Sequence, residues 1–237
     1  MGPITTTLWI GTAIMVLGLL AFLALMVKAP AANRSFFSAT SLVALIAATS
    51  YFAMATGHGS VLIGGRVFFF ARYIDWVFTT PLLLLDLALL AVPSITARAG
   101  TVATLIGADV YMIITGLIAG SINDPTKYIW FASSTIAFVV VLYILLVQLF
   151  GDARNRGGSV GRLFGNLSLL TLILWVCYPI VWLLGVEGFR VLPLTAEVVI
   201  FALLDVVAKI GFGFILLTSS VISGREAMTV RPATSSM

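Results

Sequence analysis

Apolar residues fill seven stretches of this chain, and short polar segments separate them. Each stretch has about the 20 residues that an α-helix needs to cross the roughly 30 Å hydrocarbon core of a bilayer. The stretches are continuously apolar and do not alternate with polar residues, so helices are expected and not barrel strands. The predicted spans are Thr6–Lys28, Phe36–Thr56, Val67–Val92, Gly100–Gly120, Lys127–Phe150, Leu163–Leu184 and Pro193–Ser219. The pattern predicts an all-α membrane protein, a bundle of seven transmembrane helices.

The composition agrees with a membrane protein, because 61% of the 237 residues are apolar and 9% are charged. Soluble domains carry about a quarter charged residues. The connecting segments are short and rich in Gly, Pro, Asn and Ser, with no linker that could separate two domains. We therefore expect residues 1–237 to form one domain in the cell membrane, with residues 220–237 as a cytoplasmic tail. No basic segment interleaved with aromatic residues lies outside the spans, so no nucleic-acid partner is expected.

Positive charges are distributed unequally between the two sides of the predicted bundle. One side, formed by the connections after spans one, three and five and by the C-terminal tail, holds Lys28, Arg34, Arg98, Arg154, Arg156, Arg162, Arg225 and Arg231. The opposite side holds Arg66, Lys127 and Arg190. Because cytoplasmic loops carry the excess of Lys and Arg, this bias predicts an extracellular N-terminus and a cytoplasmic C-terminus.

Lys209 lies within the seventh apolar span, four residues after Asp205. Four residues make about one helical turn, so the two side chains share one face of the helix. Lys209 is ten residues from Ser219, or about 15 Å of helix, which is too far for its side chain to reach the interface. Charged groups at this depth are costly and usually mark a functional site. We expect Lys209 to be buried and either paired or covalently modified.

The third span carries Arg72, Asp75, Thr79 and Asp86 in one helix. The two carboxylates are eleven residues apart, which returns the helix to nearly the same face after about 16 Å. One carboxylate thus lies toward the outer half of the span and the other toward the inner half. Arg72 and Thr79 lie one turn to either side of Asp75 and can bias its charge or hydrogen-bond it. Two stacked carboxylates near a buried cation suit proton relay, although a structural polar clamp between helices is the alternative.

Three motifs carry a resemblance to a known family, namely RYxDWxFTTPLLLLDL in span three, LWxxYPxxWLxG in span six and LDxxAKxGFG in span seven. In this order they resemble the microbial rhodopsins, and most closely the bacteriorhodopsin-like outward proton pumps. The resemblance covers the chain from the first span to Ser219. It implies all-trans retinal bound covalently to Lys209 as a protonated Schiff base, with Asp75 and Asp205 as counter-ions. Light would then move a proton to Asp75, and Asp86 would replace it.

The resemblance also implies roles for further residues. Thr79 completes the Asp-Thr-Asp set of an outward proton pump, and Thr40 matches the hydroxyl partner of Asp86. Glu187 and Glu197 match the pair that releases the proton to the outside, although Val186 and Phe69 stand where polar partners are expected. The residues that match the retinal pocket are Tyr51, Tyr73, Trp76, Thr80, Met112, Gly116, Phe131, Ser134, Phe138, Trp175, Tyr178, Pro179 and Trp182. Asp109 matches a buried carboxyl that bonds a neighbouring helix.

The chain departs from the bacteriorhodopsin pattern in the ring end of the pocket and in two connections as well. Phe131 is bulky, so no window for an antenna carotenoid is expected, and Phe138 should alter the contacts of the retinal ring. The connections after spans one and three contain no carboxylates. The resemblance implies acidic residues there that collect protons, and in this chain they are missing. We therefore expect Asp86 to be refilled from the cytoplasm slowly or in a pH-dependent way.

These observations predict a light-driven outward proton pump in membrane lipid, an ion transporter and not an enzyme. A homo-oligomer, trimer or pentamer, is expected, and no bound metal. The main alternative is a retinal photosensor that signals to a membrane transducer, against which the inner carboxylate Asp86 argues. A chemically gated seven-helix receptor is a further alternative, but it gives Lys209 no physical role.

Overall fold

The computed structural model describes residues 2–224 and is almost entirely helical. Within these residues seven helices are long and apolar enough to cross a membrane, so the predicted fold class is confirmed. The first four are α1 (Pro3–Val27), α2 (Arg34–Ala55, preceded by the short η1, Ala31–Asn33), α3 (Phe70–Ala91) and α4 (Ala99–Ser121, preceded by the short η2, Thr96–Arg98). The fifth joins α5 (Lys127–Tyr143), the π-helical η3 (Ile144–Leu149) and α6 (Phe150–Arg156). The sixth is α7 (Gly158–Leu184), and the seventh joins α8 (Leu194–Asp205), the π-helical η4 (Val206–Gly211) and α9 (Phe212–Thr218).

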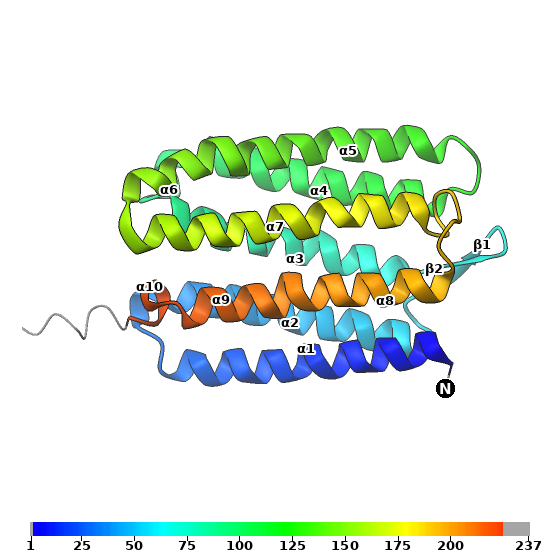
Figure 1. Ribbon diagram of the computed structural model, residues 1–237, viewed down its shortest axis with the longest axis horizontal. Helices are drawn as coiled ribbons and strands as arrows, with labels where there is room; N and C mark the ends of the chain where they lie inside the picture. The colour runs from blue at the N-terminus through cyan, green and yellow to red at the C-terminus, as the bar shows by residue number, and fades with distance from the viewer. Residues whose placement is uncertain (1, 225–237) are drawn as a thin grey trace, which may run out of the picture.

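The seven helices lie side by side along one axis (Figure 1). The N-terminus lies at the end of the bundle that also carries a β-hairpin, here called the hairpin end. The short helix α10 (Ser220–Ser223) lies at the opposite end, here called the α10 end. An odd number of crossings requires this separation. The predicted tail charges Arg225 and Arg231 lie outside the described residues.

Helices adjacent in sequence pack against each other from α1 to α5, and α1 also contacts α8, so the bundle closes on itself. Helix α3 is the most buried of the seven. In its most apolar 18-residue window 61% of the residues are buried, against 28% for α1. The buried face of such a helix can hold polar side chains away from lipid, and α3 carries Arg72, Asp75, Thr79 and Asp86.

The connection between the fifth and sixth helices differs from the prediction, which treated Arg154, Arg156 and Arg162 as loop residues. Both helices continue past the apolar run, and Gly157 alone separates α6 from α7. Polar residues such as Arg154 are good helix formers in water, so apolarity marks where the bilayer ends and not where the helix ends. Gly157 reverses the chain because its φ of 68° is accessible to glycine without steric cost.

A β-hairpin between α2 and α3 was not predicted. Strands β1 (Val61–Ile63) and β2 (Arg66–Phe68) pair antiparallel, with Val61 opposite Phe68. Gly64 and Gly65, with φ of 55° and 79°, form the two-residue turn. Two glycines between short apolar runs are a hairpin signal in the sequence. The apolar residues after them fall instead in the predicted third span, which begins at Val67.

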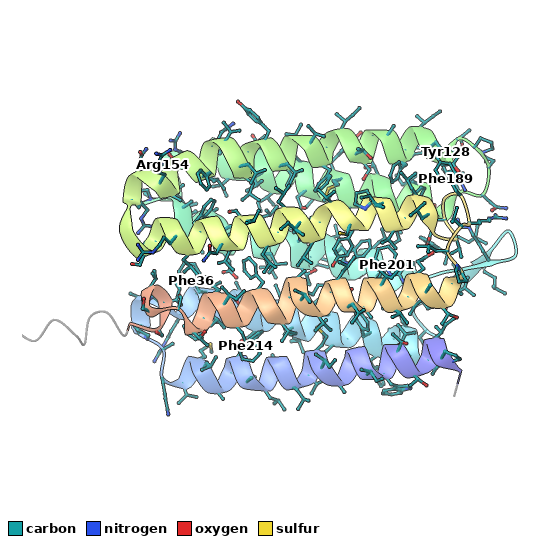
Figure 2. All side chains as sticks on the ribbon, viewed as in Figure 1. Phe36, Tyr128, Arg154, Phe189, Phe201 and Phe214 are labelled. Atoms are coloured by element: carbon teal, nitrogen blue, oxygen red, sulfur yellow. The ribbon has the colours of Figure 1, made fainter. Side chains whose placement is uncertain are left out.

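Close helix contacts and buried polar bonds hold the bundle together, because lipid provides no hydrophobic drive between helices. Gly11 of α1 lies against the ring of Tyr51 on α2, where a Cβ atom would come within 2.4 Å of the ring. The hydroxyl of Tyr51 is itself bonded to Asp205, at 2.8 Å, so the ring cannot swing away freely. Apolar side chains cover the outside of the helices, and Figure 2 shows Arg154 at one end and Tyr128 with Phe189 at the other.

The contact at Gly11 predicts a measurable loss of stability on a small substitution. We expect Gly11→Ala to lower the free energy of unfolding by about 1–2 kcal/mol, because overpacking outweighs the gain in helix propensity. Gly107→Ala on α4 is the matched control, since a Cβ atom there meets nothing within 4 Å. Thermal unfolding followed by circular dichroism in detergent measures both variants. Equal melting temperatures for the two would show that the Tyr51 ring yields without cost.

Candidate functional site

Lys209 lies at the centre of a buried ion-pair cluster. It projects from the π-helical segment η4 in the seventh membrane helix and is 2% exposed. Its Nζ donates to Asp75 Oδ2 of α3 at 2.5 Å and to Asp205 Oδ1 of α8 at 2.7 Å. The predicted burial of Lys209 and its one-turn pairing with Asp205 are therefore present. The bond to Asp75 joins residues 134 positions apart and closes the site between two helices.

Asp205 is held by a ring of neutral donors in addition to Lys209. The hydroxyl of Tyr51 donates to Oδ2 at 2.8 Å, and that of Tyr178 donates to Oδ1 at 3.0 Å. The indole Nε1 of Trp76 donates to Oδ1 at 3.2 Å. These side chains come from α2, α7 and α3, so the carboxylate ties three helices to the seventh. A buried carboxylate with this many donors is fixed in position.

Asp75 has one oxygen on Lys209 and a second, Oδ1, that has no hydrogen-bond partner within residues 2–224. Thr79, expected to bond this carboxylate, donates instead to the main-chain carbonyl of Asp75 at 2.9 Å. A threonine hydroxyl in a helix commonly bonds the carbonyl one turn before it, and here that bond holds the hydroxyl. Arg72 lies one turn from Asp75 but pairs with Glu197.

Asp86 lies further along α3, toward the α10 end, and is fully buried. Its Oδ2 accepts a hydrogen bond from Thr40 of α2 at 3.0 Å, and Oδ1 has no partner within the described residues. No ion pair reaches it there, in contrast to Asp75. The two carboxylates of α3 therefore have different surroundings, one charged and one neutral.

A second charged cluster lies at the hairpin end. Arg72 Nη1 pairs with Glu197 Oε1 at 3.2 Å, and its guanidinium carbon lies 4.2 Å from the centre of the Phe201 ring, which Figure 2 labels on α8. Glu197 Oε2 accepts the main-chain N–H of Val186 at 2.7 Å. The neighbouring Glu187 is 1% exposed, and its Oε2 has no partner within residues 2–224. Burial, together with the negative charge of Glu197, raises the pKa of Glu187 to about 7.

Lys127 belongs to this cluster, which the sequence did not indicate. It is 6% exposed, and its Nζ donates to the main-chain carbonyl of Glu187 at 2.5 Å. Arg66 of β2 is buried as well and donates to the carbonyl oxygens of Gly120 and Ile122 at the end of α4. In the sequence both residues count as charges at the outer ends of the spans. Such a position does not reveal which parts of the chain cover a side chain.

A cavity extends from Lys209 between α3, α4, α5 and α7. The predicted pocket residues that line it are Tyr73, Trp76, Thr80, Met112, Gly116, Phe131, Ser134, Phe138, Trp175, Tyr178, Pro179 and Trp182. Tyr51 does not line the cavity and contacts the site through Asp205. Leu83, Ile113, Thr135 and Ala208 also line it and were missed, although they lie three or fewer residues from predicted positions.

Most residues of the cavity wall are aromatic or apolar, and the two charged residues in it are Asp205 and Lys209. Phe131 and Trp182 stack with their ring centres 4.5 Å apart. On the α4 side, Thr80 donates to Asp109 Oδ2 at 2.7 Å and joins α3 to α4. The lining suits an apolar molecule with a carbonyl at one end, because the amine of Lys209 could form an imine there.

Comparison with known proteins identifies relatives over the whole described structure. Residues 2–223 match the family described as "Bacteriorhodopsin-like protein". The chain is 47% identical to the bacteriorhodopsin of Haloterrigena sp. (strain arg-4) over 236 residues, which cover 95% of this chain and 92% of that protein.

Two solved structures share the fold. The thermophilic rhodopsin from Rubrobacter xylanophilus is 49% identical, with a TM-score of 0.90 over 91% of this chain and 95% of that one. The light-driven proton pump from Coccomyxa subellipsoidea is 36% identical, with a TM-score of 0.87 over 92% and 97%. With its seven membrane-length helices, the chain is a multi-pass integral membrane protein of the cell membrane that belongs to the bacteriorhodopsin-like family of microbial rhodopsins.

Proposed function

We propose that this protein is a light-driven outward proton pump with retinal bound to Lys209. The observation that carries the proposal is the arrangement on α3, where Asp75 contacts the Lys209 amine and Asp86 lies farther along the same helix in an uncharged environment. The solved relative from Coccomyxa subellipsoidea, described as a light-driven proton pump, supports the same function.

The cavity fits retinal, since its walls are apolar and aromatic and a primary amine lies at one end. Lys209 would hold retinal as a protonated Schiff base, and the bound retinal would supply the absorption of light and the change of shape that drives transport. Trp76, Trp175 and Trp182 would enclose the hydrocarbon chain of retinal. Ser134 and Phe138 line the cavity from α5.

Asp75 is the proton acceptor in this proposal. Its Oδ2 contacts Lys209 Nζ, so a proton can pass between them without an intervening group. Asp205 contacts the same nitrogen but accepts three further hydrogen bonds from Tyr51, Tyr178 and Trp76. Asp205 therefore remains in place as a fixed counter-ion, whereas the Oδ1 of Asp75 is open to accept a proton.

Asp86 is the proton donor. With no cation beside it in the described structure, a buried carboxyl is most stable with its proton, which it can deliver toward Lys209 from the α10 end. The hydroxyl of Thr40 orients it through Oδ2. Asp86 lies about 16 Å of helix from Asp75, which contacts Lys209. The transfer of a proton from Asp86 to Lys209 therefore requires water or a movement of side chains.

The cluster at the hairpin end releases the proton to the outside. Arg72 is the member of this cluster that lies one turn from Asp75, and a shift of its guanidinium away from a newly neutral Asp75 would alter the charge felt by Glu197. Glu187 holds a proton below about pH 7 and is the group that can give it up.

The distribution of Lys and Arg supports an orientation with the hairpin end outside and the α10 end in the cytoplasm. The proton thus moves outward, from Asp86 through Lys209 and Asp75 to the Glu187 and Glu197 cluster. We further propose one retinal-binding domain per chain and a homo-oligomer, trimer or pentamer, in the membrane.

The direction of transport is tested in an unbuffered suspension of expressing cells supplied with retinal and illuminated. We expect acidification of the medium that a protonophore abolishes, and we expect Asp75→Asn to give none. Asp109→Asn is the matched control, because an amide can still accept the bond from Thr80 and the residue does not contact Lys209. Alkalinisation abolished by the protonophore would indicate an inward pump. Coloured cells without any pH change would favour the photosensor.

Removal of the donor predicts a slow late phase of the photocycle. We expect Asp86→Asn to slow the return of the proton to Lys209 by about 10²–10⁴-fold, the usual contribution of a positioned acid, and to make the rate fall as pH rises. Thr40→Val keeps the carboxyl and should slow this step far less. Time-resolved visible absorption measures both, and an unchanged late decay in Asp86→Asn would rule out its donor role.

The raised pKa of Glu187 predicts that early proton release depends on pH. Below about pH 7 the side chain carries the proton, and above it the proton is already lost. The early signal of a pH-sensitive dye after a flash should therefore shrink between about pH 6 and about pH 8. Glu187→Gln should abolish it at every pH, whereas Asp124→Asn, which changes an exposed carboxylate of the α4–α5 connection, should not. An early signal of constant size in the unaltered protein would contradict the assignment.

A further inference from the structure

A cleft at the α10 end lies between α6 and α7, away from the retinal cavity. Its walls are formed by Phe150, Arg154, Gly157, Gly158, Gly161 and Arg162. Figure 2 shows Arg154 at this end of the bundle, on the last turns of α6. The two helices approach closely here, because a Cβ atom at Gly161 would lie 3.2 Å from the carbonyl oxygen of Ala153.

Arg154 and Arg162 bring two positive charges from different helices to this cleft, and no acidic residue is part of its wall. The nearby Asp152 is paired with Arg98, and Arg156 donates to the carbonyl oxygens of Leu90 and Val92. Neither Arg154 nor Arg162 has a hydrogen bond or ion pair to another side chain within residues 2–224. Both guanidinium groups are exposed, and their planar donors suit a phosphate that enters the cleft.

The backbone of the cleft adds to this positive potential. Helix α7 is 27 residues long, begins at Gly158 and has neither an acidic residue in its first turn nor a side-chain cap. Gly157 and Gly158 turn the chain with φ of 68° and 54°, and three of the six wall positions carry no side chain. An anion can therefore approach the main chain as well as the two arginines.

An apolar surface continues from the cleft toward the middle of the membrane. The side chain of Phe150, in the cleft wall, is 41% exposed. Val147 lies one turn closer to the middle of the membrane on the fifth helix and is 56% exposed. On α7, Leu169 is two turns deeper than Arg162 and is 55% exposed. The charged cleft and this apolar surface together match a molecule with a phosphate at one end and a hydrocarbon chain at the other.

We propose that the cleft between α6 and α7 binds the phosphate of an anionic membrane lipid, with the acyl chains along Phe150 and Leu169. The position at the end of a membrane-length helix favours a lipid over a soluble phosphate, because basic pockets between membrane helices on the cytoplasmic side bind such headgroups. The site is independent of the pumping residues.

The test uses the full-length, retinal-loaded protein, freed of lipid in detergent and titrated with phosphatidylglycerol or with phosphatidylcholine. Native mass spectrometry counts the bound lipids. We expect one phosphatidylglycerol to bind more tightly than the rest, and its affinity to fall roughly 20- to 30-fold in Arg154→Gln/Arg162→Gln. Lys28→Gln/Arg34→Gln removes two exposed charges from the same end of the bundle and should leave this lipid bound. An unchanged visible absorption band shows that each variant is folded.

Three results would overturn the proposal. Equal losses in the two double variants would mean that net charge alone attracts the lipid. Equal affinity for phosphatidylcholine would mean that the headgroup charge is not recognised. Displacement of phosphatidylglycerol by an equal concentration of inorganic phosphate would mean that the cleft takes a free anion and not a lipid.

Discussion

The ion-pair cluster of Lys209 with Asp75 and Asp205 is the interaction on which the rest of the structure depends. A single ammonium group at bilayer depth is too costly to leave unpaired. With only one carboxylate the pair would be neutral, and no charged counter-ion would remain once that carboxylate accepted a proton. Two carboxylates leave one net negative charge, which Tyr51, Tyr178 and Trp76 stabilise through Asp205. Because these donors come from different helices, the cluster also fixes how the second, third, sixth and seventh helices pack.

The two ends of the proposed proton path have opposite characters. Toward the hairpin end, Arg72, Glu197, Glu187 and Lys127 form a dense and buried charged cluster. Toward the α10 end, Asp86 is paired with Thr40 alone among the described residues and is surrounded by apolar packing. Charged groups can pass a proton on as soon as one of them changes its charge, whereas an isolated carboxyl holds its proton until the surroundings change. In the proposed mechanism this asymmetry would give the transport its direction.

The surface at the α10 end is basic, and its charges have different partners. Arg98 pairs with Asp152 and Arg156 caps the end of α3, so these residues join the ends of helices. Arg154 and Arg162 face a cleft instead. A basic surface would raise the local concentration of anions and not of protons, which is consistent with a donor that is refilled slowly.

The sequence alone determined the class of fold, because seven apolar runs of membrane length leave helices as the structure that satisfies the backbone in lipid. It also singled out Lys209, Asp75, Asp86 and Asp205, since ionisable residues within apolar spans stand out against their neighbours. The tertiary structure alone decided which groups meet. The contacts of Lys209 with Asp75, of Arg72 with Glu197 and of Lys127 with the Glu187 carbonyl join positions 60 or more residues apart. Helical periodicity places a side chain on a face of its own helix, but only the packing of the bundle decides what lies opposite that face.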